Sequence, residues 1–252
     1  MSSSWFARLA PCVLAIGCIE LLFSCGNSST TGDLEAPPTS MDGGIWNKRD
    51  FGIPWNTSVA YGTVTDLRDS QVYRTVKIGS QTWFAENLNY KLSGADSGWC
   101  YNNSPDSCAK YGRMYTWSMV MGVSRKYDST VLGSSHSLQG ICPSGWRVPL
   151  DTDWWILMDT VGVDSARIKL SAAGGWDTKY FKGTDNGFRA LPGGLRYNPT
   201  PYMGVGQSGY FWTSSEDTAA AAWDWNFNFG DSRITHQTGD KSIPVSLRCI
   251  KN

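Results

Sequence analysis

The sequence has no surplus of charge of either sign. Its 252 residues include 22 lysines and arginines and 22 aspartates and glutamates, so the formal net charge is zero. A nucleic-acid-binding domain carries a positive excess, and an intrinsically disordered chain commonly carries a high net charge. The composition therefore argues against both classes and predicts a folded protein with no nucleic-acid partner.

Metal-ligating residues are also scarce. The two histidines are His136 and His236, and no Cys-x-x-Cys spacing occurs. A structural zinc site needs clustered nitrogen and sulfur ligands. We therefore expect no metal and no cofactor, and calcium has no support in the sequence. Both histidines are interpreted as surface residues because they lie in polar stretches.

Motifs of nucleophilic and phosphate-binding enzymes are absent. Ser214 and Ser215 lack a Gly-x-Ser-x-Gly frame, and "GTDNGFRALPGG" is followed by no Gly-Lys-Ser/Thr. Glycoside hydrolysis would need two carboxyl groups about 5–10 Å apart, a distance that a sequence does not define. We expect loop carboxylates that lie on a solvated surface or cap turns, and no enzyme activity. The carboxylates that could pair are Asp185, Glu216, Asp217, Asp224 and Asp231.

The N-terminus is typical of an exported lipoprotein. Arg8 precedes an apolar run from Leu9 to Phe23, which is short for a membrane span. The run leads into Leu22-Phe23-Ser24-Cys25, which resembles a bacterial lipobox. We therefore predict a lipoprotein signal peptide at 1–24 and lipidation of Cys25. Cleavage near Ser24 without lipidation and a competing site at Cys18 are the alternatives.

The next segment is small, polar and rich in proline and glycine. Residues 25–45 are therefore predicted to be a disordered tether, and residues 46–252 to be the folded domain. Several acyl chains on one cysteine would anchor the protein durably. We expect an outer-membrane lipoprotein of the cell envelope, and its exposure at the cell surface stays open.

Four cysteines remain after Cys12, Cys18 and Cys25 are set aside. An even number in an exported chain indicates disulfides. Cys100 and Cys108 flank the short polar stretch "CYNNSPDSC", so we pair them locally. The remaining pair is then Cys142 with Cys249, out of three possible pairings.

The pattern of apolar residues predicts an α+β fold. The 13 tryptophans and 27 glycines suit bulky side chains on a loop-rich backbone better than a helical bundle. We expect a hairpin within 75–88, a strand leading into a short helix within 111–122, and a helix beginning at 151–153. The C-terminal third reads as short strands separated by glycines. The apolar stripe of the longer helix is Trp154, Leu157, Met158 and Val161.

The stretch "WDWNFNFG" (223–230) alternates aromatic and polar residues without interruption. Successive side chains of a β-strand point to opposite faces, so one face is aromatic and the other polar. Burying aromatic rings is favourable by roughly 25 cal/mol per Å², and an exposed row would promote aggregation. We expect the aromatic face in the core and the polar face exposed, either as a site for hydroxyl-rich ligands or as plain solvated surface. The aromatic residues are Trp223, Trp225, Phe227 and Phe229, and the polar ones are Asp224, Asn226 and Asn228.

Five blocks resemble, in the same order, the Fibrobacter succinogenes major paralogous domain (FISUMP) family. The resemblance implies a C-type-lectin-like fold, with two helices, a mainly antiparallel twisted sheet and a long loop region tied by end-to-end disulfides. It implies an exported, often lipid-anchored protein and brings no settled activity. The blocks are "GTVTDLRDSQVYRTVKIGSQTWFAENLNY", "CPSGWRVPLDTDWW", "GFRALPGGLR", "GYFWTSSE" and "SLRCIKN", and they cover roughly residues 60–251.

The chain departs from two groups of proteins that it otherwise resembles. "GWRVP…DW" and "LRC" look like blocks of formylglycine-generating enzyme relatives, but "LPGGLRYNPTPYMG" has no reactive cysteine pair. The resemblance therefore does not bring their copper-dependent oxidation. The Glu-Pro-Asn, Gln-Pro-Asp and Trp-Asn-Asp triplets of calcium-dependent sugar-binding lectins are also absent.

Three aromatic residues in glycine- and proline-rich loops are the best candidates for contacting a ligand. They are Trp176 in "AAGGWDTKY" and both Tyr197 and Tyr202 in "LRYNPTPYMG". Loops lie mainly on the surface and carry many binding residues. Asp224, Asn226 and Asn228 complete the candidate set. The alternative is that the loop aromatics pack within their own loops.

These observations predict a lipid-anchored envelope protein with an extracytoplasmic binding module. The expected partner is a polysaccharide or a cell-surface protein, which would suit a role in adhesion. A structural or assembly subunit that binds protein partners is the first alternative. A carbohydrate-active enzyme is the second, and it would require two loop carboxylates to converge.

Overall fold

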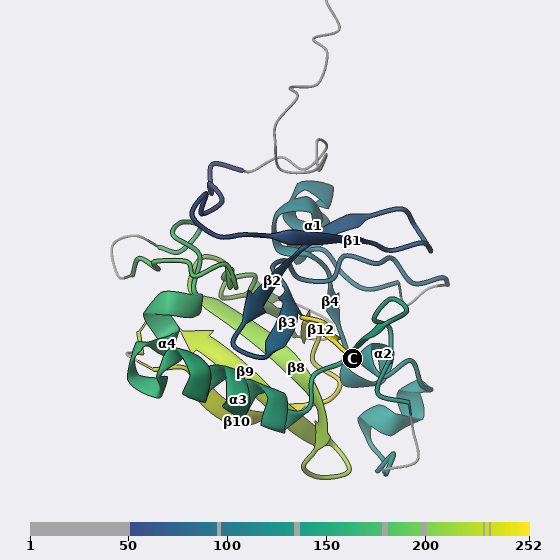
Figure 1. Cartoon of the computed structure of the whole chain (residues 1–252). Coiled ribbons are helices and arrows are strands. Elements are labelled where there is room, and N and C mark those ends of the chain that lie inside the picture. The colour runs from purple at the N-terminus through teal and green to yellow at the C-terminus, as the bar shows by residue number, and fades with distance from the viewer. Residues whose placement is uncertain are drawn as a thin grey trace, which may run out of the picture. The chain divides into compact units, whose positions relative to one another are not determined.

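The computed structural model describes residues 51–94, 97–133, 137–177, 181–197, 201–228, 230–231 and 233–252. The predicted signal peptide (1–24), Cys25 and the tether (25–45) lie outside the described residues, as do His136 and Phe229. The described part forms an α+β fold of short helices and curled, mainly antiparallel sheets (Figure 1). No helix within it is long and apolar enough to cross a membrane.

One five-stranded sheet joins the beginning and the end of the described chain. Its hairpin of β2 and β3 was predicted within 75–88, and Ile78 pairs with Gln81 across the turn. Gly79 has a positive φ of 59°, which favours glycine in a tight turn. The strands, in spatial order, are β1 (Gly62–Thr65), β2 (Val72–Ile78), β3 (Gln81–Phe84), β12 (Ile250–Lys251) and β5 (Trp146–Arg147).

A second five-stranded sheet carries the alternating aromatic stretch on β9. Its pairings are antiparallel except that β11 runs parallel to β8. The spatial order is β10 (Thr235–Asp240), β9 (Ala221–Asn228), β8 (Ser208–Glu216), β11 (Val245–Ser246) and β4 (Met114–Tyr115). A two-stranded sheet of β6 (Leu195–Arg196) and β7 (Tyr202–Met203) lies beside the second sheet, where Gly194 bridges to Gly209 on β8.

The longest described helix, α3 (Asp151–Val161), begins where the sequence predicts. The Asp153 carboxylate accepts the backbone N–H of Leu150 at 2.7 Å and also binds Arg147 at 2.6 Å, so it caps the first turn. The predicted stripe on this helix is buried. Helix α4 (Val163–Leu170) follows directly, and both helices lie across one face of the second sheet (Figure 1).

Shorter helices occupy the first half of the described chain. The stretch between Cys100 and Cys108, expected as a loop, is a 3₁₀ turn η1 (Tyr101–Asn103) that leads into α1 (Pro105–Tyr111). Pro105 occupies the first helical turn, where its missing N–H costs nothing. The predicted strand and short helix are β4 and α2 (Trp117–Val120), and η2 (Arg125–Asp128) follows. The chain therefore has more helices than the two that the resemblance implied.

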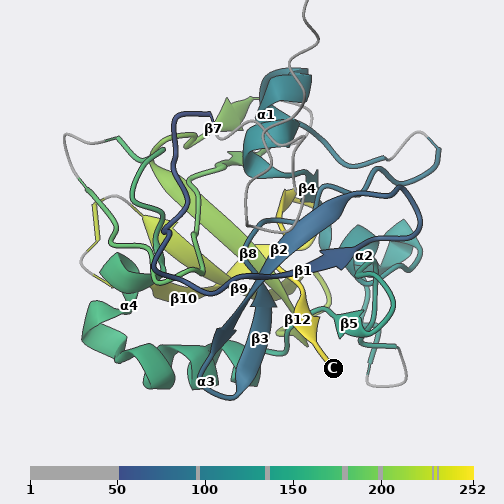
Figure 2. The ribbon, with the colours of Figure 1, turned by 45° about the horizontal axis from the view of Figure 1, so that its top comes forward.

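The second sheet is packed on both faces. Phe211 contributes to the core under α3, whereas its neighbour Trp212 contributes to a second core on the opposite face. This alternation is the ordinary consequence of the strand's two-residue period. Trp225 and Phe227 join the first core, which confirms the prediction for these two aromatic residues. Figure 2 shows α3 and α4 along one side of this sheet.

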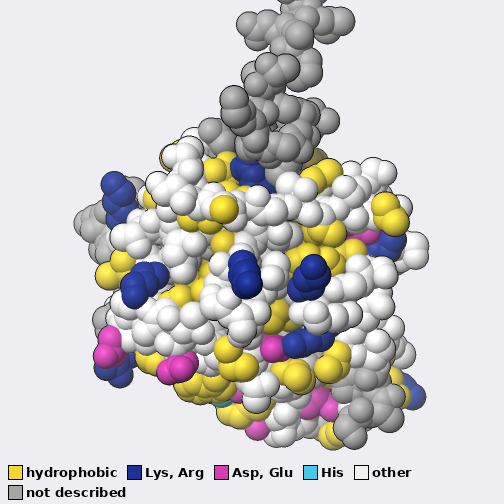
Figure 3. Space-filling view, viewed as in Figure 1, with side chains coloured by type: hydrophobic (Ala, Val, Ile, Leu, Met, Phe, Trp, Pro, Cys, Tyr) yellow, Lys and Arg dark blue, Asp and Glu magenta, His cyan; other side chains and the backbone are white. Residues whose placement is uncertain are grey.

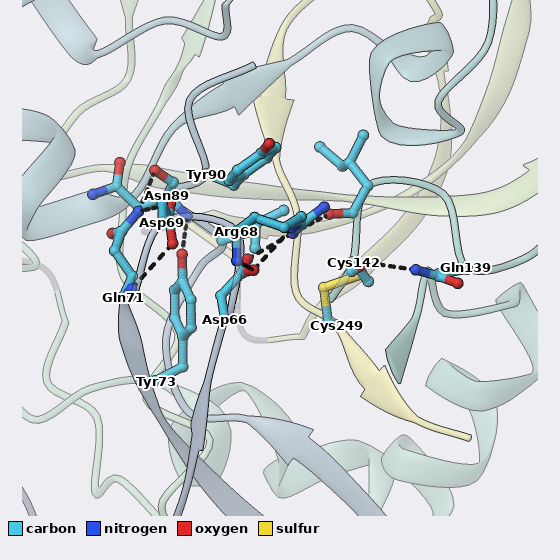
Figure 4. Close-up of polar contacts among 12 residues, drawn as sticks. Asp66, Arg68, Asp69, Gln71, Tyr73, Asn89, Tyr90, Gln139, Cys142 and Cys249 are labelled. Atoms are coloured by element: carbon cyan, nitrogen blue, oxygen red, sulfur yellow. Dashed lines mark hydrogen bonds and ion pairs between the residues drawn. A yellow bond between two sulfur atoms is a disulfide. The ribbon is translucent and has the colours of Figure 1, made fainter. Parts of the chain in front are cut away.

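Both predicted disulfides are present. Cys100 pairs with Cys108, eight residues away, and Cys142 pairs with Cys249, 107 residues away. Figure 4 shows the second disulfide beside the turn at Asp66 and Arg68. Arg68 binds the Asp66 carboxylate at 2.6 Å and also donates to the carbonyl of Ile141 at 2.9 Å. The turn after β1 is thereby fastened to the segment that carries Cys142.

Candidate functional site

Trp176 is buried instead of being exposed in its loop. Its side chain is 4% exposed, and its indole N–H donates to the carbonyl of Ala190 at 3.3 Å. The Arg167 guanidinium lies 4.4 Å from the centre of a Trp176 ring. The glycine-rich stretch therefore turns this ring into the core, and Trp176 is not available to contact a ligand.

The polar face of β9 is also buried, which corrects the expectation of an exposed row. Asp224 and Asn226 are 3% and 5% exposed, and Asn228 is half-buried. The reason is the second core on that face, where Trp212 pairs with Asp224 and Tyr210 pairs with Asn226 on the neighbouring strand. This face is consequently not a ready surface for hydroxyl-rich ligands.

Burial changes the ionisation of Asp224. Desolvation raises the pKa of its carboxyl group to about 7, although a side-chain hydrogen bond from Gln237 acts in the opposite direction. Among the described residues, the Oδ1 atoms of Asp224 and Asn226 have no hydrogen-bond partner. Asp224 is therefore a buried acid whose uncharged form is favoured by its surroundings.

The remaining candidate carboxylates have separate surroundings. Glu216 binds the buried Lys241 at 2.6 Å and accepts the backbone N–H groups of Leu132 and Gly133. Asp185 is 1% exposed and accepts the backbone N–H of Gly187 at 3.0 Å, so it caps a turn, which is the second of the two roles expected for these carboxylates. Two others, Asp217 and Asp231, are exposed.

Tyr197 and Tyr202 do lie on the surface, at the β6–β7 hairpin. Tyr197 is 44% exposed, and Tyr202 donates its hydroxyl to Oδ1 of Asn103 at 2.7 Å. The Tyr202 and Tyr101 rings lie 5.2 Å apart with 52° between their planes. Two distant segments thus meet here. Tyr197 directly follows Arg196, the cross-strand partner of Tyr202, so the alternation of the hairpin places it on the other side from Tyr202. We call the set Tyr101, Asn103 and Tyr202 the hairpin face.

Local chemistry explains why this face has its shape. Asn103 has a positive φ of 55°, a conformation that asparagine tolerates well. The Cys100–Cys108 disulfide fixes the chain directly beside Tyr101. On the hairpin, Gly194 has φ 71°, and a Cβ there would lie 2.2 Å from the carbonyl oxygen of Met203. Glycine is therefore required for the two strands of the hairpin to approach each other.

Sequence reasoning missed a second aromatic surface, formed by α3, β9 and β10. His236 lies parallel to Trp223, with ring centres 4.3 Å apart and 13° between the planes. It is half-buried, and its ring centre lies 5.2 Å from that of Trp155, so it belongs to an aromatic surface and not to an isolated polar stretch. We call Asp151, Trp155, Trp223 and His236 the tryptophan–histidine face.

Asp151 connects the rings of this face. Its carboxylate accepts the indole N–H groups of Trp155 and Trp225, each at 3.0 Å. Nε2 of His236 lies 2.8 Å from Oδ1 of Asp151, although the pair does not have the alignment of a hydrogen bond. The four-residue spacing of Asp151 and Trp155 on one helix was the available sequence signal.

Metal-ligating side chains do not cluster in the part of the chain that the structure describes. Within the described ranges, no group of three His, Cys, Asp or Glu side chains could hold a metal ion.

The fold and its surfaces define a class, namely a disulfide-linked α+β domain with solvent-facing aromatic residues. The Fibrobacter succinogenes major domain matches residues 76–251, and the chain belongs to this family. Comparison with curated proteins and with solved structures found no match.

Proposed function

We propose that this chain is a lipid-anchored protein of the cell envelope whose folded domain binds a polysaccharide outside the cell. The observation that carries the proposal is the hairpin face, where the half-buried rings of Tyr101 and Tyr202 stand beside the exposed amide of Asn103. Such rings cover the apolar faces of sugars, and the amide can exchange hydrogen bonds with hydroxyl groups. The signal sequence and Cys25 supply the anchor.

The same proposal includes a C-type-lectin-like fold. Two features support it: a mainly antiparallel sheet with one parallel pair, and a disulfide between the middle and the end of the chain. Likeness of fold would not define the ligand, because unrelated functions share folds. The ligand is therefore argued from the hairpin face alone.

Charge on the surface is consistent with an uncharged ligand. Figure 3 shows basic side chains spread singly over one face, with acidic and apolar side chains between them. A large surface area that carries charge of one sign attracts oppositely charged partners. The chain as a whole has zero net charge. A neutral polysaccharide suits this surface better than an acidic one.

The test is retention of the full chain, with both disulfides formed, on insoluble cellulose and related plant polysaccharides. The variant Y197A/Y202A should lose retention because it removes the Tyr202 ring of the hairpin face and the exposed Tyr197 ring of the same hairpin. M203A is the matched control, since Met203 is 50% exposed on the same hairpin and is not aromatic. Absence of wild-type retention on every polysaccharide would refute the proposal and favour a structural subunit that binds protein partners.

A further inference from the structure

The tryptophan–histidine face has the properties of a second binding site. Trp155 is 47% exposed, yet its indole N–H is held by Asp151 at 3.0 Å. A large exposed ring normally gains from burial, and fixing its orientation in advance lowers the entropy lost on binding. This ring is therefore both available and preorganised.

Polar groups stand beside the ring. The side chains of His236 and Asp151 are 21% and 19% exposed, so ligand hydroxyls can reach their edges. An ionised carboxylate offers about four lone-pair sites. Trp155, Trp225 and His236 approach the Asp151 carboxylate, which leaves acceptor capacity for a ligand hydroxyl.

The negative charge of Asp151 selects among ligands. An acidic ligand placed next to this carboxylate would be repelled, whereas a neutral hydroxyl would donate a hydrogen bond to it. The flat apolar surface of Trp155 and the neighbouring Trp223–His236 pair suit the ring faces of a sugar. The chemistry fits a neutral glycan.

The two faces lie at opposite ends of the domain. Asn103 and Tyr101 immediately precede α1, whereas Asp151 and Trp155 lie on α3. Both ribbon views place α1 at one end and α3 at the other (Figures 1 and 2). Ligands bound at the two faces would therefore not compete for space.

We propose that the tryptophan–histidine face is a second site for neutral glycans, so that one domain bridges two glycan segments. The inference rests on the proposed polysaccharide binding and adds a site and a consequence to it. Linking two weak sites raises overall retention on a polymer well above that of either site alone.

The test uses the full chain and hydroxyethylcellulose, a soluble neutral glucan. Bridging predicts turbidity that rises with added protein and falls again when protein is in excess. W155A should abolish the turbidity and weaken polymer binding about tenfold, as expected for loss of an aromatic anchor. W155F should keep part of both, because a ring remains. I156A is the matched control, since Ile156 is 48% exposed on the same helix.

The outcomes separate the two proposals. If W155A binds and clouds the polymer as wild type does, the second site is refuted while polysaccharide binding stands. If Y197A/Y202A still binds and W155A does not, the tryptophan–histidine face stands as a glycan site, whereas the hairpin face and the bridging of two segments are refuted. If wild type binds no polysaccharide, both fail. The same binding measurement with polygalacturonate, an acidic polymer, tests the preference for neutral ligands. Binding as strong as that to hydroxyethylcellulose, and lost in W155A, would contradict this preference.

Discussion

Arg248 donates from both Nε and Nη2 to the side-chain oxygen of Asn87, at 3.0 and 2.7 Å, although the two residues lie 161 positions apart. The guanidinium is fully buried, and burial lowers its pKa to about 9. It also donates to the backbone carbonyls of Phe84 and Phe188. This one side chain therefore joins three segments of the core.

We expect R248A to lower the free energy of unfolding by about 3–5 kcal/mol, because it leaves several buried acceptors without a donor. R248K should also be strongly destabilising, since an ammonium group cannot reproduce the guanidinium fork. Urea unfolding at neutral pH measures both. The surface variant R233A is the control, because Arg233 is 69% exposed. A loss below about 1 kcal/mol in R248A would contradict the assigned role.

The two disulfides should differ in what they contribute. Chain-entropy arguments give about 4–5 kcal/mol for closing a loop of roughly 107 residues and about 2.5 kcal/mol for one of roughly 8 residues. The double variant C142A/C249A should therefore lower the free energy of unfolding more than C100A/C108A does. Urea unfolding of both variants tests the order, and the reverse order would contradict it.

The short disulfide should matter more for binding than for stability. It fixes the chain beside Tyr101, which belongs to the hairpin face. We expect C100A/C108A to reduce retention on polysaccharide, while C142A/C249A retains it under conditions where both stay folded. Far-ultraviolet circular dichroism of each variant provides the folding control.

Asp224 should make the protein less stable as the pH rises. Its folded-state pKa of about 7 lies above its ordinary value of 3.8, so the folded protein holds this proton more tightly than the unfolded chain does. The free energy of unfolding should therefore fall as the pH increases from about 4 to 7. D224N mimics the protonated form and should remove this fall.

The expected gain of D224N over wild type at pH 8 is on the order of 2–4 kcal/mol, since one pKa unit is worth about 1.4 kcal/mol. At pH 4 the two proteins should have nearly equal stability. Urea midpoints across this range provide the measurement, with D217N as a control because Asp217 is exposed. A constant difference at every pH would rule out titration of Asp224 as the cause.

Glu216 should have the opposite effect. Burial favours a higher pKa for its carboxyl group, but hydrogen bonds from Lys241, Leu132 and Gly133 outweigh it and lower the pKa. Its contribution to stability is thus present above about pH 4.5 and is lost as the pH falls through the lower folded-state value. E216Q should be destabilised at pH 7, on the order of 3 kcal/mol, because Lys241 is left buried without its anion. The gap to wild type should close in acid, and a gap that widens there would contradict the pairing.

Local patterns were sufficient for several parts of the fold. The β2–β3 hairpin follows from two apolar runs around Gly79, and the buried stripe of α3 follows from its helical period. The disulfide pairing followed from the short stretch between Cys100 and Cys108. In each of these cases the interactions that determine the structure lie within a few residues of one another. The second disulfide then follows because Cys142 and Cys249 are the two cysteines that remain.

The sequence alone placed Trp225 and Phe227 in the core, but it did not reveal what covers the opposite face of their strand. Asp224 is buried because a second core packs there, and Trp176 is buried because Arg167 on α4 and the carbonyl of Ala190 pack against it. The meeting of Asp151 with His236 likewise depends on how α3 crosses the sheet. Period and composition determine which side chains share a face of one element, whereas exposure of that face depends on long-range packing, which only the tertiary structure decides.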